Sequence, residues 1–247
     1  MDIVDPRRRF TATVEMYDKF RPSYPGELVD WVLERAGRPE TAADVGCGTG
    51  ISTRLFAERG LTMTGVDANP DMLKKAQARG GAEYVRGEAR QTGLPEHAFD
   101  LVIAAQAFHW FEVEPALTEF KRILKPGGAC AAFWNDRTNG TPFMKGYEDL
   151  LLAYSSEYKK LRGKQGAIAD ITNSPQVGGL AKEEFRNVQV MDRGVFLGRV
   201  YSSSYVVHGV SRPRDFAKEL DALFERHEKD GRVEFVYGAA AICWRLK

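Results

Sequence analysis

The chain contains little cysteine, and the cysteines it has form no pattern. Cys47, Cys130 and Cys243 are odd in number, far apart and without the spacing of metal ligands. Such a distribution disfavours both a disulfide-stabilised scaffold and a zinc site. We therefore expect three reduced thiols, no bound metal and a cytoplasmic protein.

Long apolar runs and an excess of charge are absent as well. No stretch approaches the roughly 20 apolar residues of a membrane-spanning helix, and the first residues lack the basic and apolar segments of a signal peptide. Lysine and arginine number 35 against 34 aspartates and glutamates, so the net charge is only +1. The one dense basic run, residues 7–9, is expected to be a solvated tail. Without a broad positive field we expect no nucleic acid as a partner, and no membrane.

The composition is that of a folded protein, and strand and helix patterns alternate from residue 41 onward. Of the 247 residues 43% are hydrophobic and 28% charged, which allows a substantial core. Alternation of this kind predicts an α/β fold, a parallel sheet with helices on both faces. The predicted strands are 42–45, 62–67, 82–86, 99–105 and 129–134, and the predicted helices are 25–37, 52–59, 70–79 and 115–124.

After residue 135 the alternation stops. A helix over 143–161 and a glycine-rich, polar stretch to residue 179 predict an inserted helical cap at 136–182. Beyond it the patterns predict a strand over 185–197, a helix over 213–229 and a last strand over 232–245. The chain therefore divides into a lead-in and helix (1–40), a core (41–135), the cap (136–182) and a completion of the sheet (183–247).

Glycine is concentrated directly after the first predicted strand, at Gly46, Gly48 and Gly50. Because glycine has no Cβ, this cluster lets the backbone turn sharply and approach a ligand. The dinucleotide pattern G-x-G-x-x-G is not met, since Ile51 stands where it would continue. Asp67 ends the next strand about 20 residues on, where an acid meets ribose hydroxyls. Nicotinamide dinucleotides and S-adenosylmethionine both carry such a ribose, so either fits.

The segment Asp44 to Gly50 resembles the first motif of the class I S-adenosylmethionine-dependent methyltransferases. The resemblance covers about residues 40 to 135. It implies a Rossmann-like, doubly wound, seven-stranded and mostly parallel sheet with an antiparallel C-terminal edge strand. It also implies S-adenosyl-L-methionine as cofactor and S-adenosyl-L-homocysteine as product. The further matching segments, in the family's order, are 65–73, 87–89, 94–95, 99–102 and 124–128.

Two other segments, 17–25 and 104–111, resemble a subgroup of small-molecule methyltransferases of the trans-aconitate type. In that subgroup the N-terminal segment closes over the cofactor. The resemblance implies that Tyr17 faces the sulfonium and takes part in catalysis. It also implies that the planar guanidinium of Arg21 clamps the methionine carboxylate.

The resemblance also assigns roles to residues of the core. Asp67 would accept hydrogen bonds from both ribose hydroxyls, and Asp44 would hold the glycine loop and approach the methionine amino group. Met72 would pack on the adenine ring, although core packing explains it equally well. The expected cofactor residues are Tyr17, Arg21, Asp44, Gly46, Cys47, Gly48, Thr49, Gly50, Asp67, Ala68, Met72, Glu88, Ala89 and Gln106.

The acceptor side has fewer signals. His109, within the second segment, is a candidate base for an acceptor hydroxyl or carboxylic acid, and a structural histidine beneath the loop is the equal alternative. Trp110, Trp134 and Tyr205 are candidates to line an apolar acceptor pocket, although aromatic residues at strand ends belong to the core at least as often. The segment 201–210 is expected to form a loop or short helix nearby.

These observations predict methyl transfer from S-adenosylmethionine to a small-molecule acceptor, at oxygen, carbon or nitrogen. Displacement at a sulfonium needs positioning and exclusion of water rather than a metal. One alternative is a nicotinamide-dependent oxidoreductase, which the missing third glycine and the lack of a Tyr-x-x-x-Lys pair disfavour. The other is a protein that keeps this fold without catalysis. The sequence indicates neither the acceptor nor the oligomeric state.

Overall fold

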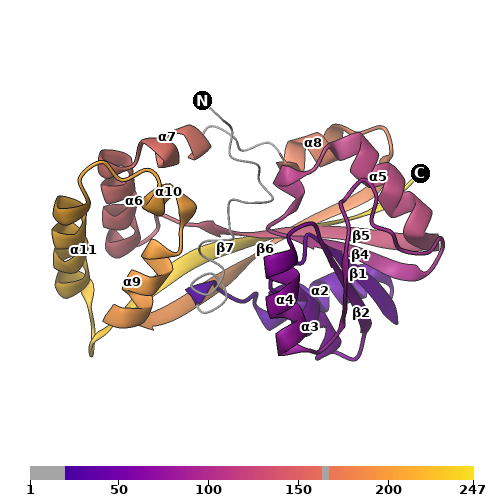
Figure 1. Ribbon diagram of the computed structural model, residues 1–247, viewed down its shortest axis with the longest axis horizontal. Coiled ribbons are helices and arrows are strands. Elements are labelled where there is room, and N and C mark those ends of the chain that lie inside the picture. The colour runs from indigo at the N-terminus through magenta and orange to yellow at the C-terminus, as the bar shows by residue number, and fades with distance from the viewer. Residues whose placement is uncertain (1–19, 163–166) are drawn as a thin grey trace.

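A computed structural model of the protein describes residues 20–162 and 167–247 (Figure 1). Its strands are β1 (Thr41–Val45), β2 (Thr62–Asp67), β3 (Glu83–Arg86), β4 (Phe99–Ala105), β5 (Leu124–Arg137), β6 (Val177–Asp192) and β7 (Arg232–Leu246). Its helices are α2 (Gly26–Ala36), α3 (Ile51–Ala57), α4 (Pro70–Arg79), the short 3₁₀ helix η2 (Phe108–Trp110), α5 (Val113–Ile123), α6 (Pro142–Tyr154), α7 (Ser156–Arg162), α8 (Ala167–Asn173), α9 (Arg193–Tyr201), α10 (Ser204–Val207) and α11 (Pro213–His227).

The strands form one seven-stranded sheet in the order β3-β2-β1-β4-β5-β7-β6. Strands β1 to β5 are parallel, and β7 runs antiparallel to both β5 and β6. The predicted α/β fold with an antiparallel last strand is confirmed, although β6 rather than β7 occupies the edge. The strand order reverses between β1 and β4, and the carboxyl ends of the strands at such a point form a ligand crevice.

Both faces of the central strands are buried because alternate side chains enter different cores. Along β4, Val102 and Ala104 belong to one core cluster, whereas Leu101 and Ile103 belong to another. Helices α5 and α8 cover the first face, and α2 and α3 cover the second. This double covering explains why the strands read as nearly continuous apolar runs.

A second lobe lies beside the α/β lobe, at the far ends of the long strands β6 and β7 (Figure 1). Helices α6, α9, α10 and α11 pack there around Phe196 of α9, which is fully buried. Its ring centroid lies 5.4 Å from that of Phe143 on α6 and 5.8 Å from that of Phe224 on α11. We call these helices, with α7, the helical lobe. The helical lobe takes its residues from both sides of β6, so it includes more than the segment 136–182.

The sequence predicts one continuous helix over 143–161, but the structure has two helices there, because Ser155 separates α6 from α7. The Ser155 hydroxyl donates to the Tyr205 carbonyl at 2.6 Å and accepts from the Tyr158 amide at 3.1 Å. It therefore caps α7 and ties α7 to α10. Helix α10 is the short helix expected within residues 201–210.

The predicted strand over 185–197 is also displaced, since β6 begins at Val177 and ends at Asp192. The Asp192 side chain accepts from the Val195 amide at 2.8 Å and so starts α9. Gly178, expected in the glycine-rich loop, lies within β6 at a shift in pairing with β7. A bulge of this kind accommodates glycine inside a strand, which the sequence pattern did not indicate.

No helix in the described ranges combines the length and the apolar character that crossing a bilayer requires.

Candidate functional site

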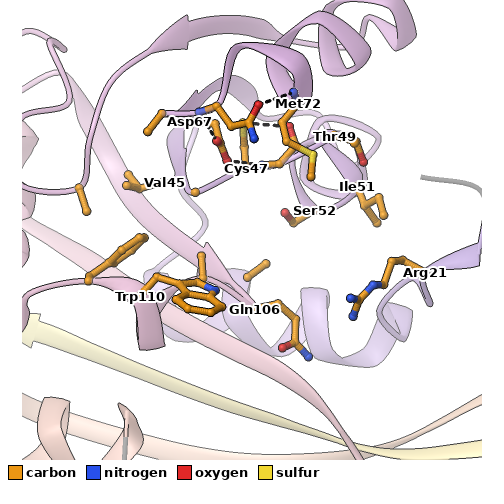
Figure 2. Close-up of a pocket in the computed structure, with 18 of the residues that line it drawn as sticks. Arg21, Val45, Cys47, Thr49, Ile51, Ser52, Asp67, Met72, Gln106 and Trp110 are labelled. Atoms are coloured by element: carbon orange, nitrogen blue, oxygen red, sulfur yellow. Dashed lines mark hydrogen bonds between the residues drawn. The ribbon is translucent and has the colours of Figure 1, made fainter. Parts of the chain in front are cut away.

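A cavity of about 450 Å³ lies at the carboxyl ends of β1, β2, β3 and β4. Its size is typical of sites for small ligands. Figure 2 shows Asp67, Cys47 and Thr49 on one side of this space and Gln106, Trp110 and Arg21 on the other. The expected cofactor residues that line it are Arg21, Gly46, Cys47, Gly48, Thr49, Asp67, Ala68, Met72, Glu88, Ala89 and Gln106.

The glycine loop after β1 folds back over the end of β2. The amides of Gly46 and Cys47 both donate to the Val66 carbonyl, at 2.8 and 3.0 Å. Gly46 has a φ of +76°, and a Cβ there would lie 2.5 Å from the Cβ of Ala107. Gly48 also has a positive φ, of +56°, but a Cβ there would meet nothing within 4 Å. Gly46 thus permits close packing of two loops, and Gly48 leaves the backbone open to a ligand.

Two expected cofactor residues stand behind this loop rather than against the cavity, and one lies outside the described residues. Gly50 precedes α3 with a φ of +77°, and a Cβ there would lie 2.5 Å from the Tyr84 hydroxyl. Its role in the structure is to shape the start of α3. Asp44 is fully buried beneath the loop. Tyr17, the expected catalytic and cofactor residue, lies outside the described ranges, as does the basic run at 7–9.

The carboxylate of Asp67 is held in place by two backbone amides. Gly48 donates to its Oδ2 and Asn69 to its Oδ1, both at 2.8 Å. Burial raises the pKa of Asp67 although these hydrogen bonds oppose the change. Each carboxylate oxygen can accept more than one hydrogen bond, so acceptor capacity remains for a ligand in the cavity.

Asn69 lines the cavity as well, although it was not among the residues expected there. Its side-chain oxygen accepts from the amides of Asp71 and Met72, at 2.9 and 3.3 Å, and so caps α4. Pro70 follows at the first helical position. Asparagine before proline at a helix start is a recognisable capping signal. The cap aims the first turn of α4, with Met72, at the cavity.

Asp44 joins the glycine loop to α3. Its Oδ2 accepts from the hydroxyls of Ser52 and Thr53, each at 2.6 Å. Its Oδ1 has no hydrogen-bond partner in the described structure. Burial raises the pKa of Asp44 to about 6 despite the two hydroxyls. The approach of Asp44 to a methionine amino group stays a prediction.

Replacement of Asp44 by asparagine is expected to change how stability depends on pH. The pKa of Asp44 is about 6 in the folded chain, against 3.8 for an aspartate exposed to water. Between pH 4 and 6 the unfolded state therefore loses this proton while the native state keeps it, so the free energy of unfolding falls as pH rises. At ~1.36 kcal/mol per pKa unit the loss is about 3 kcal/mol, complete above pH 6. Urea unfolding of the wild type and Asp44→Asn across this range measures it; a constant difference between the two would contradict it.

The segment that carries Arg21 is held against the sheet by side-chain amides of residues on β5 and β6. The Ser23 carbonyl accepts from the side-chain amides of Asn135 on β5 and Asn187 on β6, at 3.2 and 2.7 Å. The Gln189 side chain donates to the Phe20 carbonyl at 3.3 Å. These contacts hold the segment so that Arg21 lines the cavity. They depend on strand pairing, so the sequence could not indicate them.

Gln106 stands at the end of β4 with a φ of +53°, which is uncommon for a residue with a side chain. Its amide donates to the Phe133 carbonyl at 2.9 Å, and its side chain donates to the Asn135 carbonyl at 3.1 Å. Two hydrogen bonds to β5 therefore stabilise this conformation at the cavity.

The aromatic segment after Gln106 divides between cavity and surface. Trp110 and Phe111 line the cavity. His109 is exposed on η2, with its ring centroid 4.9 Å from that of Trp110, and is not among the described lining residues. Its role as a base stays a prediction.

The acceptor side differs from the expectation in three residues. Trp134 is buried in the core beneath the sheet, and Tyr205 packs inside the helical lobe. Neither is among the described residues that line the cavity, whereas Arg199 of α9 is. Arg199 follows Phe196 by three residues, so the two share one buried face of α9. In the sequence, the signal that could have identified Arg199 is an arginine on an otherwise apolar face of a helix.

The described residues show no second site built from cysteines or metal ligands. All three cysteines are free and buried. Within the part of the chain that the structure describes, no three histidine, cysteine, aspartate or glutamate side chains are placed to hold a metal ion.

The chain is similar in sequence to known methyltransferases. Residues 43–132 match the family model described as a methyltransferase domain. The chain contains a class I S-adenosylmethionine-dependent methyltransferase domain. An uncharacterized methyltransferase of Mycobacterium bovis is 39% identical over 129 residues, which are 52% of each chain. A malonyl-[acyl-carrier protein] O-methyltransferase of Serratia marcescens is 38% identical over 91 residues, 36% of each chain.

The solved structure assigned as a type II methyltransferase from Anaeromyxobacter dehalogenans has a TM-score of 0.70 and 26% identity, over 92% of this chain and 98% of that one. The match to the Mycobacterium bovis methyltransferase spans about half the length of that relative. The finer resemblance to trans-aconitate-type methyltransferases stays a prediction.

S-adenosylmethionine is the cofactor of the class I methyltransferase domains, the family that residues 43–132 match. One feature of the cavity itself, apart from the sequence motifs, fits a polar ligand such as this cofactor. Thr49 lines the cavity, and its buried hydroxyl has no hydrogen-bond partner within the described structure. A buried polar group without a partner is costly unless a ligand or water supplies one. Together with the open space beside the Gly48 backbone, this leaves one unpaired polar group where a polar ligand would lie.

Proposed function

We propose that the protein transfers the methyl group of S-adenosylmethionine to a small-molecule acceptor in the cytoplasm, at oxygen, nitrogen or carbon. One observation carries the proposal. The glycine loop, Asp67, Met72 and Arg21 come from four different segments and line one cavity. The cavity continues past Gln106 to Trp110 and to the helical lobe, which supplies room for an acceptor.

The residues of this chain act by binding and orientation. Asp67 holds the ribose, the apolar side chain of Met72 packs on the adenine, and Arg21 binds the methionine carboxylate through its planar fork. When bound, the cofactor supplies a methyl group activated by the positive charge on sulfur. Trp110 and Phe111 exclude water from the acceptor side, which strengthens the electrostatic interactions inside.

A small acceptor group is supported by the size of the cavity, about 450 Å³. The Serratia marcescens relative is named for O-methylation of a malonyl group on a carrier protein. The near balance of positive and negative residues in this chain favours a small partner over a polyanion.

Calorimetry with S-adenosylhomocysteine tests the cofactor half of the proposal. We expect binding in the micromolar range, and no binding of a reduced nicotinamide dinucleotide in a fluorescence titration. Incubation with a metabolite pool and an isotopically labelled methyl donor, followed by mass analysis, then identifies the methylated product. Binding of the dinucleotide in place of S-adenosylhomocysteine would overturn the proposal.

A further inference from the structure

Two arginines lie in the polar interior of the helical lobe, next to the cavity. Arg199 on α9 is 4% exposed and lines the cavity. Arg137 at the end of β5 has a side chain that is 15% exposed. Although burial raises it, the pKa of the Tyr205 hydroxyl is lowered to about 8 by the positive charges of Arg137 and Arg199, with a smaller contribution from Arg21. The two guanidinium groups therefore share one polar cluster.

Arg137 has a full set of partners. It donates to the Tyr205 hydroxyl, and one of its nitrogens lies 3.9 Å from a carboxylate oxygen of Glu148. Its guanidinium carbon lies over the rings of Tyr158 and Tyr147, 5.1 and 5.5 Å from the ring centroids. Its positive charge is therefore balanced by a buried carboxylate and by aromatic faces.

Arg199 has only neutral partners. Its Nε donates to the Tyr237 hydroxyl at 3.1 Å, and its Nη1 donates to the Ser203 hydroxyl at 2.9 Å. Among the described residues, no carboxylate forms an ion pair with Arg199, and its Nη2 makes no hydrogen bond. The groups that act most strongly on its pKa, after burial itself, are tyrosines and the like charge of Arg137.

Among the described residues, the cluster therefore has more positive than negative charges. Glu148 offsets one of the two guanidinium charges, and Asp136, next to Arg137 in sequence, is exposed. Successive side chains of a strand point to opposite faces, so Asp136 is directed away from the cluster. Tyr205, with a pKa of about 8, is mostly protonated at pH 7. A buried charge without a counter-charge is strongly unfavourable, and the group that lacks one borders the cavity.

We propose that the acceptor of this methyltransferase carries a carboxylate, which Arg199 binds at the end of the cavity formed by the helical lobe. The inference rests on the proposed function and names the substrate class of the same site. Arg199 lacks a carboxylate partner among the described residues, whereas Arg21 is expected to bind the methionine carboxylate of the cofactor. Trp110 and Phe111 line the same cavity, so the body of the acceptor is apolar or aromatic.

Benzoate and benzamide test the proposal because they share a ring and differ in charge. Titration calorimetry is performed on the protein saturated with S-adenosylhomocysteine. We expect the wild type to bind benzoate at least about tenfold more tightly than benzamide, as loss of a charge-assisted hydrogen bond predicts. We expect Arg199→Gln to remove this preference and Arg199→Lys to keep part of it.

Arg193→Gln is the matched control. Arg193 belongs to the same helix, but its side chain is 56% exposed and pairs with Asp221 at 2.8 Å. We expect it to keep the full preference for benzoate. We also expect Arg199→Gln to bind S-adenosylhomocysteine as the wild type does, which shows that the variant is folded.

Three results would overturn the proposal. They are equal affinity of the wild type for benzoate and benzamide, an unchanged preference in Arg199→Gln, and a loss of S-adenosylhomocysteine affinity in folded Arg199→Gln, which would assign the arginine to the cofactor. The first needs no variant, so the proposal can fail even if Arg199→Gln does not fold. Failure of the proposed function itself is distinguishable, because the wild type would then not bind S-adenosylhomocysteine.

Discussion

Asp67→Ala is expected to weaken binding of S-adenosylhomocysteine by more than about 100-fold. The carboxylate is expected to accept two ribose hydroxyls, and each hydrogen bond to a charged group contributes about 1.5–3 kcal/mol. Two such bonds correspond to a factor of about 100 or more in affinity. The variant also frees the amides of Gly48 and Asn69, which Asp67 holds at 2.8 Å. Isothermal titration calorimetry measures the change.

Asp71→Ala is the control for this variant. Asp71 lies in the first turn of α4, exposed and outside the cavity lining. Its removal changes the net charge as Asp67→Ala does, and we expect the affinity to stay within about threefold of the wild type. Asp67→Asn, which keeps one acceptor oxygen without the charge, should fall between the two. If Asp67→Ala were folded and bound S-adenosylhomocysteine like the control, the ribose would not be held by Asp67.

Gly46→Ala is expected to lower the free energy of unfolding by about 2–5 kcal/mol. The left-handed conformation at φ +76° costs a residue with a Cβ about 1–2 kcal/mol. The new Cβ would also lie 2.5 Å from the Cβ of Ala107, an atom fixed to the backbone after β4. Overpacking of this kind adds about 1–3 kcal/mol. Urea unfolding followed by circular dichroism measures the loss.

Gly48→Ala separates the two costs. Its φ is also positive, at +56°, but a Cβ would meet nothing within 4 Å. Only the conformational cost of about 1–2 kcal/mol is therefore expected in the free energy of unfolding. Equal losses in the two variants would mean that the loop relaxes away from Ala107 and that its packing is not tight.

That the expected cofactor residues line one cavity was predictable because they lie close to strand ends that the sequence marks. Gly46, Gly48 and Asp67 each follow or end an apolar run, and the parallel sheet then brings these ends together. The two exceptions, Asp44 and Gly50, belong to the same motif but support the loop from behind. The spacing of a motif indicates that its residues lie close together, but it does not show which of them face the cavity.

Predictions beyond residue 135 were less successful because local patterns there are ambiguous. Gly178 suggested a loop, but a bulge within β6 accommodates it. Ser155 ends a helical pattern only because the carbonyl of Tyr205, distant in sequence, accepts its hydroxyl. Such interruptions follow from tertiary contacts, which override local propensity.

The sequence by itself determined the α/β class, the order of the core elements and the cofactor loop, because periodicity and glycine placement act over a few residues. Only the tertiary structure decided which residues line the cavity opposite the glycine loop. The antiparallel pairing of β5, β6 and β7 carries the helical lobe to the cavity and brings Arg199 to its lining. Pairing between strands so distant in the chain depends on the packing of the whole sheet, and no local pattern encodes it.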